Sequence, residues 1–149
     1  MASAASGLSG DSLSGFGRLE ISGVTLLISV GARSGPSGED PDGTIRIDRT
    51  GTHTLSGVAD VVCLRVSGNE ATTVGQLRRP VANASEPGTT YQYVLLSVTD
   101  NGSPGVSLDT FNSGVNWGSP GAVPAPSCTL FLGGTTGEAG NFTVVDAAP

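Results

Sequence analysis

The sequence predicts one all-β domain, a single antiparallel β-sandwich or barrel of about nine or ten short strands. The composition, with 23 Gly, 9 Pro and only 13% charged residues, lacks the Ala, Glu, Lys and Leu excess that builds helices. Short apolar runs alternate with Gly, Pro, Asn and Asp along the chain, and several runs show period-two alternation. A length of 149 residues suits one domain with one core.

The chain opens with a small, polar stretch at 1–15, which we expect to be a flexible N-terminal arm before a β domain at 16–149. The strands expected after it are 16–22, 24–32, 43–48, 53–58, 59–67, 71–77, 91–99, 107–112, 129–132 and 141–145.

Alternation defines the faces of two of these strands. In 43–48, Ile45 and Ile47 share one face and polar residues the other, so one side is expected to meet water. In 59–67, Val61, Cys63 and Arg65 are expected on one face, and Val62, Leu64 and Val66 on the other. Apolar residues on both faces predict a central strand.

A tight turn is expected at 67–70, because Gly68 and Asn69 tolerate positive φ between two strand-like runs. The stretch 113–127 is rich in Gly and Pro and predicts a long loop that carries Trp117 as an exposed contact residue. Tyr91 and Tyr93 are expected to share one face, as a core face or as contact residues on a cavity wall.

The two cysteines, Cys63 and Cys128, lack zinc-ligand spacing, and a disulfide is the favoured interpretation. It would close a long loop and add roughly 4 kcal/mol of stability in the chain-entropy model. Two buried free thiols in a reducing compartment remain the alternative.

Charge narrows the classes of function. The chain has no lysine, and its Arg residues are outnumbered by Asp and Glu, for a net charge of -6. A nucleic-acid partner is therefore not expected, since counterion release needs a basic footprint.

No apolar run approaches the ~18 residues of a membrane span, so no membrane insertion is expected. The N-terminus also lacks a leader pattern.

Two motifs suggest chemistry. Glu39, Asp40 and Asp42 form an acidic loop that could bind calcium, although such a site needs six or more oxygen ligands; a solvated turn is the favoured interpretation. Residues 10–13 spell the Gly-Asp-Ser-Leu block of a hydrolase family, with Ser12 as nucleophile and His53 as the only imidazole base. No Asp stands three residues before His53, so no catalytic residue and no cofactor are expected.

Four segments together resemble a family of small exported actinobacterial proteins of unassigned function: SGPSGEDPDGT at 34–44, VCLRVSGNEAT at 62–72, VTDNG at 98–102 and GNFTVVDA at 140–147. The resemblance implies an all-β domain with a Cys63 to Cys128 disulfide, and implies no catalytic residues. Without a leader, a phage-borne member of the family is one interpretation.

The expected function is that of a non-enzymatic structural or accessory surface protein. It would be either a decoration protein on an actinobacteriophage capsid or an exported cell-surface module. The expected location is therefore extracellular, on a virion or secreted, and the partner is another protein or a second copy in a homo-oligomer or capsid lattice. The alternative is an exported β-barrel that binds a small hydrophobic ligand.

Overall fold

The fold is an antiparallel sheet in a computed structural model that describes residues 10–21, 23–51, 54–82, 90–102, 110–118, 128, 135–136 and 139–147. The strands of these residues are β1 (Asp11–Ile21), β2 (Val24–Ser34), β3 (Asp42–Thr50), β4 (Leu55–Ser67), β5 (Glu70–Ala82), β6 (Thr90–Thr99), β7 (Thr110–Gly118), β8 (Thr135–Thr136) and β9 (Ala139–Val145). Every pair is antiparallel, in the order β8-β7-β6-β5-β4-β3-β2-β1-β9. The all-β prediction is confirmed, but one continuous sheet replaces the two sheets of a sandwich.

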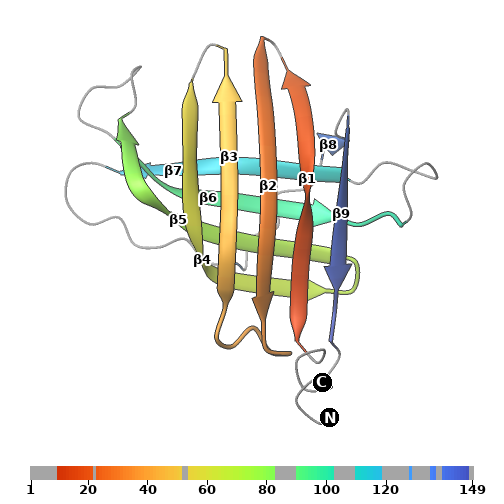
Figure 1. The fold of residues 1–149 in the computed structure, drawn as a ribbon. Coiled ribbons are helices and arrows are strands. Elements are labelled where there is room, and N and C mark those ends of the chain that lie inside the picture. The colour runs from red at the N-terminus through yellow and green to blue at the C-terminus, as the bar shows by residue number, and fades with distance from the viewer. Residues whose placement is uncertain are drawn as a thin grey trace.

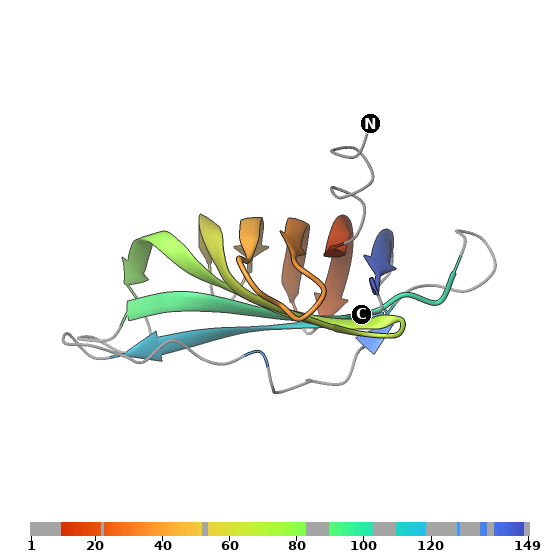
Figure 2. The ribbon, with the colours of Figure 1, turned by 90° about the horizontal axis from the view of Figure 1, so that it is seen from below.

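The sheet curls into a half-barrel. In Figure 1, β1 to β3 and β9 run upright, while β6 and β7 cross behind them at a steep angle. The end-on view in Figure 2 shows the two layers, with β4 and β5 passing from one to the other. Both strands carry a register shift, between Val61 and Cys63 in β4 and between Gln76 and Val81 in β5. Such bulges bend a strand and increase its twist, which lets one sheet fold over itself.

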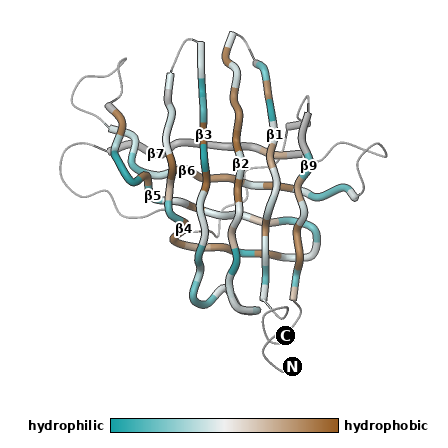
Figure 3. The backbone as a smooth tube through the Cα atoms, viewed as in Figure 1, coloured by the Kyte–Doolittle hydropathy of each residue, from teal (hydrophilic) through white to brown (hydrophobic). Residues whose placement is uncertain are grey.

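The core fills the space between the two layers. Ile28, Val30 and Ala32 of β2 alternate with exposed neighbours, and Ile45 and Ile47 are buried as predicted. Figure 3 shows hydrophobic residues on the upright strands where these cross β6 and β7. The main cluster also contains Leu13, Ala59, Val61, Leu64, Ala71, Leu77, Tyr91, Val94, Leu96, Val98, Phe111 and Phe142.

The register shift in β4 overturns the predicted face pattern. Val61 and Leu64 both lie in the main core, whereas Cys63 packs in a second cluster on the opposite face of the sheet. Strict alternation would have kept Val61 and Cys63 together, but one extra residue at the bulge reverses the sides that follow it. Runs 53–58 and 59–67, predicted as two strands, form the single strand β4 over their described residues.

Two other boundaries differ from the prediction. The arm predicted at 1–15 is wrong for 11–15, because β1 begins at Asp11 and pairs on both sides, with β2 and with β9. The loop predicted at 113–127 is wrong for 113–118, which belong to β7. Both segments are rich in Gly and Ser, which have a poor strand propensity and therefore gave no strand signal in the sequence. In the structure, hydrogen bonding to neighbouring strands outweighs that poor propensity. The strand predicted at 129–132 and the rest of the arm, 1–9, lie outside the described residues.

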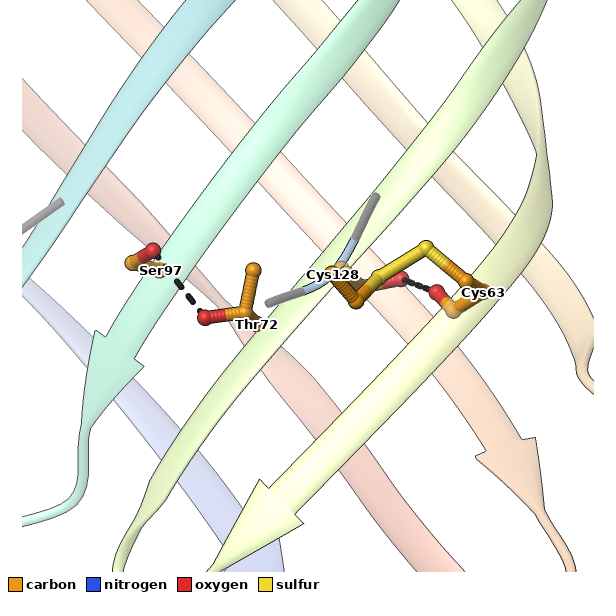
Figure 4. The surroundings of a disulfide bond; sticks show 5 residues. Cys63, Thr72, Ser97 and Cys128 are labelled. Atoms are coloured by element: carbon orange, nitrogen blue, oxygen red, sulfur yellow. Dashed lines mark hydrogen bonds between the residues drawn. A yellow bond between two sulfur atoms is a disulfide. The ribbon is translucent and has the colours of Figure 1, made fainter. Parts of the chain in front are cut away.

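The disulfide prediction is confirmed. Cys63 and Cys128 are bonded, with their Cα atoms 6.1 Å apart (Figure 4). Cys128 packs with Val74 and Tyr93 on the outer face of β5 and β6, against Cys63 and Leu95. Buried hydroxyls on these strands are hydrogen-bonded: Thr73 Oγ1 donates to the Cys63 carbonyl at 2.9 Å, and the hydroxyls of Thr72 and Ser97 lie 3.3 Å apart.

Replacing both cysteines with Ala should lower the free energy of unfolding by about 4 kcal/mol, because the bond closes a loop of 65 residues in the unfolded chain. Urea denaturation of parent and double variant, each with and without dithiothreitol, measures the loss. The reductant should destabilise the parent and leave the variant unchanged. A parent that resists full reduction without losing stability would contradict the prediction.

Gly17 of β1 provides a test of how the two layers meet. A Cβ at Gly17 would lie 2.6 Å from Phe111 Cε1 and 3.0 Å from Phe142 Cε2, where the two rings pack with centroids 5.4 Å apart. Gly17→Ala should therefore cost about 1–3 kcal/mol by overpacking. Gly31→Ala is the matched control, because a Cβ at Gly31 of β2 meets nothing within 4 Å. Equal denaturation midpoints for the two variants would refute this account of the core.

Candidate functional site

The predicted calcium ligands do not converge. The Glu39 carboxylate accepts a hydrogen bond from the Ser37 N–H at 2.7 Å, inside the loop between β2 and β3. Asp42 is the first residue of β3 and pairs with Arg33 across the strands at 3.4 Å, with both side chains exposed. Asp40 bends the loop with a positive φ of 49°. Within the described ranges, no three acidic, His or Cys side chains are grouped to hold a metal ion.

The two tyrosines predicted as contact residues are buried instead, with exposed fractions of 5% for Tyr91 and 6% for Tyr93. A register shift between them, on the side that pairs with β7, places Tyr91 in the main core and Tyr93 beside the disulfide on the opposite face. The expectation that they share a face is therefore wrong. The alternative that both tyrosines are core residues is confirmed, but they belong to two different hydrophobic clusters.

The remaining predicted residues are only partly placed. Ser12 alternates along β1 with Asp11 and Leu13, which are both buried, so its side chain lies on the other face of the strand. Trp117 is paired with Tyr91 through the backbone, and its side chain is outside the described part. His53 is also outside it. The geometry therefore brings no base to Ser12 among the residues described.

A cavity of about 380 Å³ opens at the end of the half-barrel where β1 starts, and we call it the Asp11 cavity. Its walls come from the start of β1, the loop between β2 and β3, the end of β4 and the disulfide: Asp11, Pro36, Ser37, Gly38, Leu64, Arg65, Val66 and Cys128. Gly38 lies against the carbonyl of Leu64, which brings that loop onto β4. The cavity thus lies where the two layers meet.

Asp11 is the unusual residue of this cavity. Its side chain is on the inner face, it is only 3% exposed, and Oδ1 accepts a hydrogen bond from the Ala147 N–H at 2.9 Å. Burial raises the pKa of Asp11, and the nearby Asp146 and Glu39 carboxylates raise it further, while the bond from Ala147 opposes them. An ionisable group at a cavity wall with a perturbed pKa is a candidate for function.

Further carboxylates tie the C-terminal segment to this end of the molecule. Asp100 Oδ2 accepts from the Val144 N–H at 3.1 Å, and Asp146 Oδ2 accepts from the Gly68 N–H at 2.7 Å. Asn69, in the turn between β4 and β5, exchanges hydrogen bonds with Asp100 through its backbone carbonyl and its side-chain amide. Residues from 34–44, 62–72, 98–102 and 140–147, far apart in sequence, therefore meet at one end of the half-barrel.

The outer face of β9, β1, β2 and β3 is a second candidate surface, which we call the upright face. Phe16 and Leu27 project from it on adjacent strands, with exposed fractions of 58% and 45%. Between them lies a shallow hollow of about 140 Å³, bordered by Arg46 and Asp48. The sequence contained a signal for this surface, because Phe16 shares its strand face with Ser14 and Arg18, where a polar residue is the rule.

Comparison with known proteins adds no relative: no protein-family model, curated protein or solved structure matches the chain. No helix in the part of the chain that the structure describes is long and apolar enough to cross a membrane. Fold and site together define the class as an all-β domain built on one curled antiparallel sheet, with one disulfide and a cavity at one end of the sheet.

Asp11→Asn should stabilise the protein in a pH-dependent way. A folded-state pKa above the ordinary value of 3.8 means that the folded state binds more protons there, so stability falls as pH rises through the raised pKa. Asn keeps an acceptor for Ala147 and carries no charge. The gain in melting temperature should be small below pH 3.8 and should grow toward neutral pH.

Asp60→Asn is the control of opposite sign. The Arg78 guanidinium, which donates to Asp60 at 2.9 Å, lowers the pKa of that exposed carboxyl. Asp60 therefore adds stability above its unfolded-state pKa, and this contribution is lost as pH falls, so its variant should lose a little stability at neutral pH only. A pH-independent effect of Asp11→Asn would count against the burial of that charge.

Proposed function

We propose that the protein is a non-enzymatic structural or accessory surface module that acts by binding protein, either a partner or further copies of itself. The observation that supports this most directly is the exposed pair Phe16 and Leu27 on the upright face. The two side chains lie on adjacent strands, and Val145 of β9, on the same face, is also exposed. Exposed apolar side chains that gather on one face of a domain are a feature of interaction surfaces.

The rest of the upright face fits that role. Several exposed residues around the apolar pair are small, among them Ser14, Ser29 and Thr143, so a partner can approach the sheet closely there. Arg46 and Asp48 at the border of the hollow supply charges of both signs. An apolar centre within a polar rim is the usual anatomy of a protein interface.

The disulfide supports a compartment outside the cytoplasm. Structural disulfides form and persist outside the reducing cytoplasm, which supports an extracellular location on a virion or a cell surface. The resemblance to small exported actinobacterial proteins points the same way. We therefore favour a capsid decoration protein of an actinobacteriophage, as a phage-borne member of that family, or an exported cell-surface module, over any cytoplasmic role.

The alternative of a barrel that binds a small hydrophobic ligand has less support. It was expected to use Tyr91 and Tyr93 as cavity walls, and both are packed in cores. The cavity that does exist carries the buried carboxylate of Asp11, which disfavours a purely hydrophobic ligand.

Phe16→Ser with Leu27→Ser should abolish self-association. Burying each side chain contributes about 1.5–3 kcal/mol, so losing both should weaken association by about a hundredfold or more. Light scattering over a range of protein concentrations measures the change in the oxidised protein. Val62→Ser is the matched control, since Val62 is an exposed apolar residue of β4 outside this face. A parent that remains monomeric at every concentration would contradict assembly through the upright face.

A further inference from the structure

We propose that the Asp11 cavity binds an organic cation on an apolar stem, that is, a primary ammonium or guanidinium group whose hydrocarbon part lies against Leu64 and Val66. The inference does not depend on the proposed surface function, because the cavity and the hollow on the upright face share no lining residue.

The shape and lining of the cavity suit such a ligand. A volume of about 380 Å³ falls in the range of small-molecule sites. Pro36, Leu64 and Val66 supply apolar wall, and the disulfide sulfur of Cys128 adds a polarisable surface. A lining that is part apolar and part polar can fix the orientation of a ligand that has one charged end and one hydrocarbon end.

Asp11 supplies the charged contact. Its Oδ1 accepts from the Ala147 N–H, and no other described residue donates a hydrogen bond to this side chain. Asp11 is only 3% exposed, so its carboxylate carries a desolvation cost, which a ligand donor would relieve. An ammonium or guanidinium donor would do so with a charge-assisted bond, which is stronger than a neutral one.

The field at the cavity favours a cation over an anion. Asp146 and Glu39 lie close enough to Asp11 to raise its pKa, so negative charge gathers around it. Arg65 also lines the cavity and carries a positive charge. Its side chain is exposed, and it does not contribute to the raised pKa of Asp11. The whole chain carries a net charge of -6, which raises the local concentration of cations further.

A metal ion fits less well than an organic cation. Calcium needs six to eight oxygen ligands, and among the described residues no three ligand side chains are grouped. Pro36, Leu64 and Val66 of the lining can pack against an alkyl stem and have no side-chain ligand for a metal. The same ligand chemistry could come from a free alkylamine or from a Lys or Arg side chain of a protein partner.

The test is a titration of the ¹⁵N-labelled, oxidised protein with n-butylammonium chloride, followed by two-dimensional NMR. The amides of Ala147 and Gly38, which lie at the carboxylate and at the loop wall, should shift and saturate. Butan-1-ol, which has the same stem and no charge, should bind at least about tenfold more weakly. Sodium butyrate should not bind. Equal affinity for the alcohol, or no saturable shift with the amine, would overturn the proposal.

Asp11→Asn should weaken butylammonium binding by about tenfold or more, whereas Asp60→Asn, a distant carboxylate in an ion pair with Arg78, should not change it. If Asp11→Asn fails to fold, the carboxyl ¹³C shift of Asp11 in the parent gives the answer. Bound butylammonium should lower the pH at which this carboxyl titrates, and an unchanged titration would refute the contact. The carboxylates that act on Asp11, those of Glu39 and Asp146, are followed in the same spectra.

Two further probes distinguish the source of the cation. The Nα-acetyl methylamides of lysine and arginine present the side chain as a protein would. Binding tighter than that of butylammonium identifies a partner side chain as the ligand, and binding that is equal or weaker identifies a free amine. Either result requires Asp11, and a lack of dependence on Asp11 for all three probes would sink the proposal.

Discussion

The bend of β4 and β5 is the constraint on which the rest of the structure depends. A single sheet has an apolar face that must be covered, and here no helix or second sheet is available among the described residues. The sheet covers itself by bending, so that β6 and β7 cross the upright strands (Figure 2). The register shifts at Val61 and Gln76 allow this bend, and Gly17 lets Phe111 and Phe142 meet where the layers touch.

A curled sheet leaves two edges, and the chain manages them in different ways. Thr136 of β8 and Ala139 of β9 are three peptide links apart, so their Cα atoms lie within about 11 Å although these strands flank opposite ends of the strand order. On β9, the Asp100 carboxylate accepts the Val144 N–H, and a charged group at a sheet edge discourages pairing with another chain. The edge of β9 is therefore occupied by the protein's own side chain.

The two candidate surfaces have different physical character because they lie on opposite sides of the same strands. The inner side of β1 carries the buried Asp11 to the wall of an open, partly apolar cavity, where a charge is costly and a matching ligand would be bound with selectivity. The outer side carries Phe16 into water, where apolar area favours a large and flat partner. Because side chains alternate along β1, the same strand contributes Asp11 to the cavity on one side and Phe16 to the upright face on the other.

The sequence by itself determined the class of fold, most strand positions, the wet and dry faces of β3, the turn at 67–70 and the cysteine pairing, because each depends on local pattern or on elimination. Only the tertiary structure decided that one sheet folds on itself, that Tyr91 and Tyr93 lie on opposite faces, and that Asp11 is buried beside Asp146. The physical reason is that a bulge is one residue among many in sequence but reverses every side chain beyond it. The order of the strands also brings together residues more than a hundred positions apart, as in the hydrogen bond from the Ala147 N–H to the Asp11 carboxylate.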